Sequence, residues 1–458
     1  PARAAPTPHR RRTDVPRAAQ AKGSPPMKKH VPRAATALAV ALGVALPALT
    51  AAPAASADPD GPPPPAAPSA TVHIIEVNGT EATEEAVTRR AEELTDRHGG
   101  TLRRVYHAAS QAFSVELTEE QLDGYYGDTR VDSITSDRVY RVAGRIDGTG
   151  PAASGTSADT VDAGGIQLSP PSWGLDRIDQ RDLPLDHVYR FPRGGAGVDV
   201  YVVDTGVRTG HREFWGGRAH GAYDAVRQRP GGAGDCNGHG TASAATAAGL
   251  WTGVAKGATV RSVRAFGCDG TGTLEHIMSA VDWITAHADG PSVVNLGFSG
   301  PPGSVLDLQL YAMTTAGIAY TAAAGNGDDS GRGVESCETT PARQTTAITV
   351  AATDRTDRRP AWSNHGYCTH LFAPGTDITT AGAGSDRSYV RITGTSAATA
   401  EVTGAAALHL ARHPGATPVE LDAALAAAAT EGRVRDAGPD SRNLLLYTGP
   451  ADVTGDAR

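Results

Sequence analysis

The sequence predicts an α/β domain with a mostly parallel sheet and helices on both faces, preceded by a small α+β unit. From residue 171 onward, short apolar runs that read as buried strands alternate with stretches of helical spacing. This alternation is typical of a parallel sheet that helices cover on both sides. Residues 71–143 contain a separate succession of strand and helix patterns. Because ligands of such sheets bind at the carboxyl ends of the strands, the residues that follow each run are the first candidates for a site.

Four apolar runs of the large domain are expected to be strands: 197–206, 258–267, 291–300 and 317–326. Helices are expected between and after them, at 239–250, 274–288 and 417–430. The last of these helices has Thr417 as its N-cap, Pro418 at its first position and Glu420 to complete a capping box. These signals define where it begins.

Residues 71–143 are expected to form a βαββαβ unit. The stretch "TVHIIEVNG" alternates like a strand, and residues 81–100 have helical spacing and end in two glycines. Residues 101–117 have the pattern of a strand pair. A second helix follows Thr118, which forms a capping-box pattern with Gln121, and residues 130–142 supply the last strand.

The flanking segments read as export, spacer and linker sequence. Residues 27–57 have the charged start, apolar centre and "ASA" end of a signal peptide. A membrane anchor is the alternative, but Pro47 and the Pro-rich linker 58–70 that follows favour export and a mature protein without a membrane segment. Residues 1–26 have a doubtful status, since Met27 is a plausible start. The Gly- and Ser-rich linker 144–170 is expected to hold a processing site, and residues 449–458 are a C-terminal tail.

Composition excludes some classes of function. The formal net charge of the 458 residues is −8, and the arginines are scattered, so nothing indicates a nucleic-acid partner. With 4 cysteines in 458 residues, the chain does not have the composition of a small disulfide-rich protein. The mature protein is expected to be a monomer.

Polar residues with complementary chemistry follow the apolar runs. Asp204 ends "YVVD", His239 lies in "NGHGT", Asn326 ends "TAAAGN" and Ser396 lies in "GTSAAT". A serine hydroxyl needs an imidazole to take its proton and a carboxylate to orient that imidazole. An amide such as that of Asn326, together with the N–H of Ser396 at a helix start, could bind an oxyanion. Each motif alone is weak evidence for function. For example, "DTG" also occurs in aspartic proteases, but those enzymes need two copies of the motif and this chain has one.

Taken together, these four motifs resemble the subtilisin-like serine proteases, in the branch of proteinase K and aqualysin. The order Asp, His, Ser is known for subtilisin. The resemblance implies a secreted endopeptidase with a peptidase domain at 171–448 and a subtilisin-like three-layer fold. It also implies that residues 71–143 are an inhibitory, ferredoxin-like propeptide that the enzyme removes from its own chain. Ser396 would be the nucleophile, His239 the base, Asp204 the orienting carboxylate and Asn326 the oxyanion donor.

The resemblance assigns further residues to polypeptide binding. Two edges would pair with a substrate backbone as an added strand, the first formed by Gly270, Thr271 and Gly272 and the second by Gly297, Phe298 and Ser299. The pocket for the residue before the cut would be lined by Ala323, Ala324 and Gly325. The resemblance also implies two disulfides, Cys236 with Cys268 and Cys337 with Cys368. A zinc site is the alternative for the cysteines, but no close Cys-x-x-Cys pair supports it, and no metal ligands are assigned.

The chain departs from the family after Ser396, where Ala397, Ala400 and Glu401 replace the usual Met, Pro and His. Ala242 likewise replaces a second histidine. No cofactor is required by the expected chemistry, and a structural calcium is doubtful because His370 stands where the branch has a ligating aspartate. Two other functions stay open: a secreted binding protein on a protease scaffold with impaired catalysis, and a serine hydrolase that acts on a non-peptide substrate.

Overall fold

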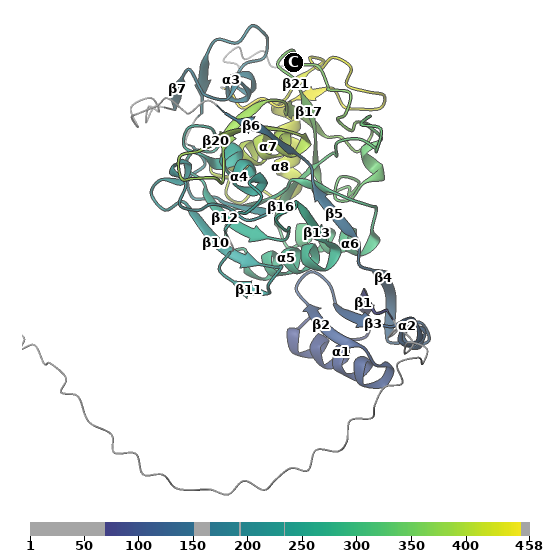
Figure 1. Ribbon diagram of the computed structural model, residues 1–458. Coiled ribbons are helices and arrows are strands. Elements are labelled where there is room, and N and C mark those ends of the chain that lie inside the picture. Colours follow the sequence, from purple (N-terminus) through teal and green to yellow (C-terminus); the bar gives the residue numbers. More distant parts are fainter. Residues whose placement is uncertain (1–68, 151–164, 192–193, 233, 450–458) are drawn as a thin grey trace, which may run out of the picture. The chain divides into compact units, whose positions relative to one another are not determined.

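A ten-stranded sheet forms the centre of the large domain in the computed structural model, which describes residues 69–150, 165–191, 194–232 and 234–449 (Figure 1). Its order is β11-β10-β12-β9-β14-β16-β17-β18-β22-β21. The pairs from β10 to β22 are parallel, and the two outermost pairs are antiparallel. The strands are β9 Asp199–Asp204, β10 Ala219–Asp224, β11 Arg229–Pro230, β12 Thr259–Arg264, β14 Ser292–Leu296, β16 Ala319–Ala323, β17 Ile348–Thr353, β18 Leu371–Pro374, β21 Thr430–Glu431 and β22 Leu444–Leu445.

Helices cover both faces of this sheet, as the sequence predicts. One face carries α4 His239–Ala248, α7 Thr395–Leu410 and α8 Pro418–Ala428. The other carries α5 Leu274–His287 and α6 Ser304–Thr315. Successive residues of β9 serve the two cores, since Val200 and Val202 pack with the first group of helices while Tyr201 and Val203 pack with the second. The shorter helices are α3 Trp173–Ile178, η2 Arg212–Phe214 and η3 Ser336–Glu338.

The N-terminal unit, residues 71–136, has the predicted βαββαβ order. Its elements are β1 Thr71–Val77, α1 Glu84–His98, β2 Thr101–Tyr106, β3 Ala112–Leu117, α2 Glu119–Tyr126 and β4 Val131–Ser136. The strands form an antiparallel sheet in the order β2-β3-β1-β4. The predicted capping box of Thr118 and Gln121 is present. Val87, Ala91 and Leu94 of α1 pack against the sheet in a separate small core.

The chain after β4 departs from the prediction of one closing strand and a linker. β5, Val139–Val142, leaves the N-terminal sheet and pairs with β13, Thr271–Thr273, and with β15, Phe298–Ser299. β6, Arg145–Thr149, pairs with β20, Tyr389–Thr393, and β20 also pairs with β19, Ile378–Ala381. In another sheet, β7, Ile166–Leu168, pairs with β8, Val188–Arg190. The start of the expected linker is therefore a strand, because it finds a partner far along the chain.

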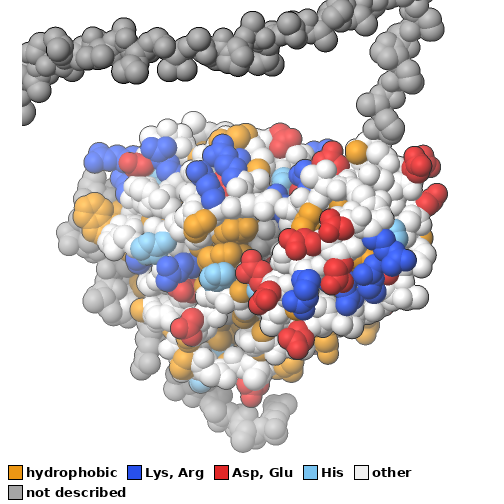
Figure 2. All heavy atoms as spheres, turned by 90° about the horizontal axis from the view of Figure 1, so that it is seen from below, with side chains coloured by type: hydrophobic (Ala, Val, Ile, Leu, Met, Phe, Trp, Pro, Cys, Tyr) orange, Lys and Arg blue, Asp and Glu red, His pale blue; other side chains and the backbone are white. Residues whose placement is uncertain are grey.

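The expected signal peptide 27–57, the segment 1–26, most of the Pro-rich linker and residues 450–458 lie outside the described residues. Among the described helices, none is long and apolar enough to cross a membrane. On the face drawn in colour in Figure 2, acidic and basic side chains are interspersed, and neither sign forms an extended patch.

Candidate active site

Asp204, His239 and Ser396 come together from three separate elements. Asp204 is the last residue of β9, His239 is the first residue of α4, and Ser396 is the second residue of α7. His239 Nδ1 lies 2.8 Å from both carboxylate oxygens of Asp204, and its Nε2 lies 2.8 Å from Ser396 Oγ. All three side chains are buried. The hydroxyl, the imidazole and the carboxylate thus form one hydrogen-bonded chain.

A second carboxylate, Asp235, fixes the loop that carries His239. Its Oδ1 accepts hydrogen bonds from the hydroxyl of Thr205 (2.9 Å) and from the backbone N–H groups of Asn237 and Gly238. Its Oδ2 accepts from both the N–H and the hydroxyl of Thr241. Asp235 is not among the residues predicted from the sequence, although the run "DCNGHGT" has an aspartate placed to accept hydrogen bonds from the start of the following helix.

The start of α7 is held by Thr395 and Asn326. Asn326 Oδ1 accepts hydrogen bonds from the N–H and from the hydroxyl of Thr395, both at 2.9 Å. Thr395 Oγ1 also accepts from the N–H of Gly325 at 3.1 Å. Because the amide oxygen of Asn326 is committed to Thr395, its NH₂ group is what remains to donate beside Ser396.

The segment from β5 to β6 passes directly over Ser396. The carbonyl oxygen of Ala143 accepts a 3.0 Å hydrogen bond from the N–H of Ser396, and the N–H of Ala143 donates to Gly297 O at 2.8 Å. A Cβ built on Gly144 would overlap Ser396 Oγ and crowd His239 Nε2. The peptide bond between Ala143 and Gly144 therefore lies against the hydroxyl of Ser396.

Both predicted edges flank β5 in the structure. On one side Thr271 pairs with Arg141 and Gly272 with Tyr140, while Gly270 O accepts from the N–H of Val142 at 3.1 Å. On the other side Phe298 pairs with Val142 and Ser299 with Arg141, next to the bond between Ala143 and Gly297. The chain's own segment is thus bound as an added central strand, the geometry expected for an extended peptide.

Ala323, Ala324 and Gly325 follow at the end of β16 and are buried. Gly325 has a φ of 104°, and a Cβ there would lie 2.5 Å from Asn364 Nδ2. Asn364, which the sequence analysis missed, donates from this nitrogen to Ala324 O at 2.8 Å. These contacts fix the turn that leads to Asn326.

The two disulfides that the resemblance implies are present. Cys236 is bonded to Cys268, and Cys337 to Cys368. The first bridge ties the loop before His239 to the loop before Gly270, and Asn237 Nδ2 adds a 2.9 Å hydrogen bond to Cys268 O. It therefore joins the loop before His239 to one of the two edges that flank β5.

The unusual residues after Ser396 are packed in different ways. Ala397 and Ala242 lie in one cluster with Trp173, Ile378 and Ile392, so the two small residues face a space that larger neighbours fill. α7 continues through Ala400 without a break, as a helix without proline can.

Glu401, in contrast, is buried without a partner. It is 1% exposed, and neither carboxylate oxygen has a hydrogen-bond partner. Burial raises the pKa of this carboxyl well above its ordinary value. A Cβ on Gly174 would overlap Glu401 Oε1, so the glycine leaves the space that the carboxyl occupies.

The doubt about a calcium site at His370 stays a prediction. His370 Nδ1 lies 3.4 Å from Asp422 Oδ1, so the position offers an imidazole and one carboxylate. Calcium takes six to eight oxygen ligands in proteins.

Comparison with known proteins gives consistent matches. The model of the Peptidase_S8 group, described as "Subtilase family", matches residues 195–443. "Extracellular serine proteinase" of Thermus sp. (strain Rt41A) is 42% identical over 351 residues, which are 76% of this chain and 78% of that protein. "Alkaline serine exoprotease A" of Vibrio alginolyticus is 38% identical over 75% of this chain and 60% of its own length.

Solved structures agree with these matches. A "cold adapted subtilisin-like serine proteinase" is 42% identical with a TM-score of 0.58 and covers 61% of this chain and 98% of its own. Fervidolysin from Fervidobacterium pennivorans shares the fold, with a TM-score of 0.65 at 20% identity over 85% of this chain and 62% of its own.

Proposed function

The chain belongs to the subtilase family and is a subtilisin-like serine endopeptidase, and we propose that Ser396, His239 and Asp204 are its catalytic triad. The observation that supports this most directly is the hydrogen-bonded chain from Asp204 through His239 to Ser396 Oγ. Its substrates are polypeptides that bind as an extended strand between β13 and β15.

The reaction begins when Ser396 Oγ attacks the carbonyl carbon of the bound peptide. His239 Nε2 takes the hydroxyl proton, and Asp204 holds the imidazole at Nδ1 and stabilises its positive charge. The oxyanion that forms receives hydrogen bonds from the N–H of Ser396 and from the NH₂ of Asn326. His239 then gives its proton to the leaving amine, and the acyl group stays on Ser396 Oγ. Water attacks the acyl carbon while His239 Nε2 takes its proton, and His239 returns this proton to Ser396 Oγ as the bond from the acyl carbon to Oγ breaks.

We further propose that the protein processes its own chain at the bond between Ala143 and Gly144. The Ala143 carbonyl already accepts the N–H of Ser396, and both neighbouring edges hold β5. After cleavage, residues up to Ala143 occupy the substrate edges as an inhibitor. The mature chain would begin at Gly144, at the start of the linker that the sequence analysis proposed for processing. The Thermus relative is named extracellular, which supports secretion of this chain as well.

An active-site-directed fluorophosphonate separates this proposal from a binding protein with impaired catalysis. The mature secreted protein should be labelled at Ser396, and Ser396→Ala should remove the label. Failure to label correctly folded mature protein would refute the role of Ser396. Casein cleavage without comparable hydrolysis of simple esters would exclude the non-peptide hydrolase.

A further inference from the structure

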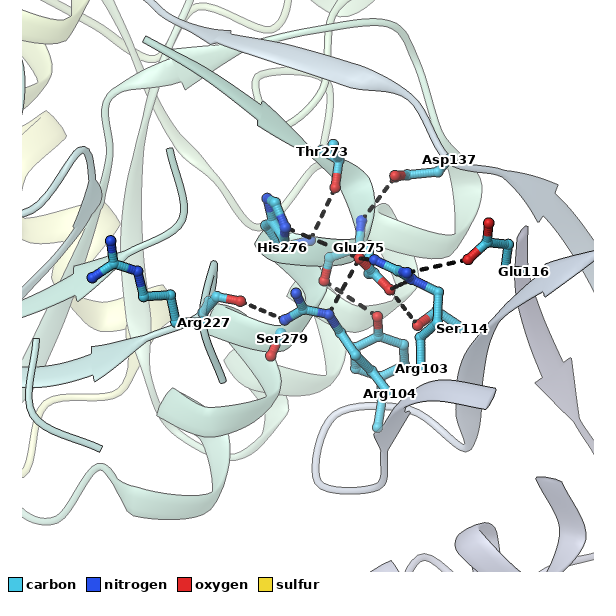
Figure 3. A network of polar contacts seen from close by, with 12 residues as sticks. Arg103, Arg104, Ser114, Glu116, Asp137, Arg227, Thr273, Glu275, His276 and Ser279 are labelled. Atoms are coloured by element: carbon cyan, nitrogen blue, oxygen red, sulfur yellow. Dashed lines mark hydrogen bonds and ion pairs between the residues drawn. The ribbon is translucent and has the colours of Figure 1, made fainter. Parts of the chain in front are cut away.

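Glu275, in the first turn of α5, is buried against the N-terminal unit. Its Oε1 accepts hydrogen bonds from Arg103 Nε and from Ser114 Oγ, both at 2.8 Å, and its Oε2 lies 3.3 Å from Arg103 Nη2 and from Arg104 Nε. Figure 3 shows the guanidinium group of Arg103 and the Nε of Arg104 beside this one carboxylate. The side chain of Glu275 is 2% exposed and that of Arg104 is 4% exposed.

The backbone of Glu275 is bound by the N-terminal unit and by Asp137, the residue that follows it. Its N–H donates to Asp137 Oδ1 at 3.0 Å, and its carbonyl accepts from the hydroxyl of Tyr106 at 3.2 Å. Within the large domain, His276 Nε2 lies 4.0 Å from Glu275 Oε2, but burial lowers the pKa of this imidazole to about 4, so it is neutral at pH 7. The cations that compensate Glu275 therefore come from β2 of the N-terminal unit.

The charges of this cluster decide which domains can cover Glu275 without burying an unpaired charge. Burial opposes ionisation of Glu275, but the hydrogen bond from Arg103 and the charge of Arg104 hold its pKa below the ordinary value, so it is an anion in the complex. Arg104 is committed as well, because its Nη1 donates to Ala225 O of the large domain. Arg103 is 37% exposed and has a second partner in Glu116 at 3.4 Å.

A buried ion pair contributes little net affinity over two neutral groups, but removal of one partner leaves the other charge buried and unpaired. Such a pair selects between partners by penalising the wrong one. A domain that covered α5 without a cation at the place of Arg104 would bury Glu275 without full compensation.

We propose that Glu275 selects the chain's own N-terminal unit as its inhibitor, by rejecting any domain that covers α5 without a matching arginine pair. The partner it fits is a strand that presents two consecutive arginines, as β2 does with Arg103 and Arg104. This rests on the proposed function, in which residues up to Ala143 remain bound after cleavage. Glu275 lies outside the strand-binding edges, so it recognises the inhibitor and leaves short peptide substrates unaffected.

The test uses full-length chains in a cycle of Arg104→Met, Glu275→Gln and the double variant. Arg89→Met is the matched control, because Arg89 is exposed on α1. Cleavage is followed on gels, and release of the inhibitor by the onset of activity on a short chromogenic peptide. We expect every chain to be cut, Arg104→Met to release the N-terminal unit at least tenfold faster, and the double variant to return to within about threefold of the wild type.

Equal release rates for Arg104→Met and the wild type would overturn the proposal, as would a double variant that releases as fast as Arg104→Met. After full release, kcat/KM for the short peptide should be the same in all chains, and a change in Glu275→Gln would assign this residue to the substrate site instead.

The same cycle in a Ser396→Ala background, read as the urea midpoint of the uncleaved chain, does not require catalysis. Arg104→Met should lower the midpoint and the added Glu275→Gln should restore it, whereas additive losses would refute the selection. Absence of cleavage in the wild type would contradict the proposed function. The urea midpoints would then decide separately whether Glu275 selects the N-terminal unit.

Discussion

Replacement of Glu401 by glutamine should raise the free energy of unfolding relative to that of the wild type, and this difference should grow as the pH rises. The carboxyl is buried in α7 beside Gly174, and no hydrogen-bond donor reaches either oxygen. Its pKa is raised by burial, so the folded state keeps the proton at pH values where the unfolded state loses it. The stability that the neutral carboxyl contributes is therefore fully present below the unfolded pKa, about 4.3, and is lost as the pH rises towards the folded pKa.

The size of the effect follows from proton linkage. Between the two pKa values, the unfolding free energy of the wild type should fall relative to that of Glu401→Gln by about 1.4 kcal/mol per pH unit. In a domain of this size that corresponds to roughly 2–3 °C in Tm per pH unit. Titrations elsewhere in the chain cancel in this difference, because both proteins carry them.

The assay is thermal unfolding at a series of pH values from 4 to 9. Both proteins are compared in a Ser396→Ala background, which prevents self-digestion. Glu431→Gln, at an exposed position of β21, controls for the change in net charge. A Tm difference between wild type and Glu401→Gln that stays constant over this range would refute the conclusion that Glu401 is held neutral in the fold.

Three further variants test the proposed chemistry and the loop that supports it. Asn326→Ala should lower kcat on a peptide substrate by about 100- to 1,000-fold with little change in KM, because the lost donor acts on the oxyanion; a loss below threefold would exclude that role. Asp204→Asn should lower kcat by about 10,000-fold at neutral pH while the fold is retained by circular dichroism, and near-normal turnover would refute the orienting role. Removal of the Cys236–Cys268 bridge by paired serine substitutions should lower the unfolding free energy by about 3–4 kcal/mol in urea titrations, and an unchanged midpoint would show that the surrounding hydrogen bonds suffice.

The parts of the site that the sequence predicts are those that short local patterns determine. Asp204 ends a buried strand, and Ser396 and His239 stand at helix starts, so each motif contains both the residue and the turn that presents it. The fold class follows from the alternation of apolar runs and helical stretches, and the capping boxes at Thr118 and Thr417 form as predicted.

The features that the sequence did not predict depend on partners far along the chain. Residues 130–142 were expected to form one strand of the N-terminal unit, but β5 separates from β4 and pairs with β13 and β15, more than a hundred residues away. β6 becomes a strand because β20 offers it an edge that is equally far along the chain. Ala397 packs in one cluster with Trp173 and Ile378, and the Glu401 carboxyl occupies space that a side chain at Gly174 would take. Local propensity carries no information about such pairings, so a segment rich in glycine and polar residues reads as a linker.

The N-terminus of the secreted protein, determined by sequencing and intact mass for the wild type and for Ser396→Ala, tests the central claim most directly. The first wild-type product should begin at Gly144, and purified Ser396→Ala should remain uncut and retain residues 71–143. A first cut at another bond would contradict the placement of Ala143 at the nucleophile. Self-maturation of purified Ser396→Ala would contradict the proposed mechanism itself.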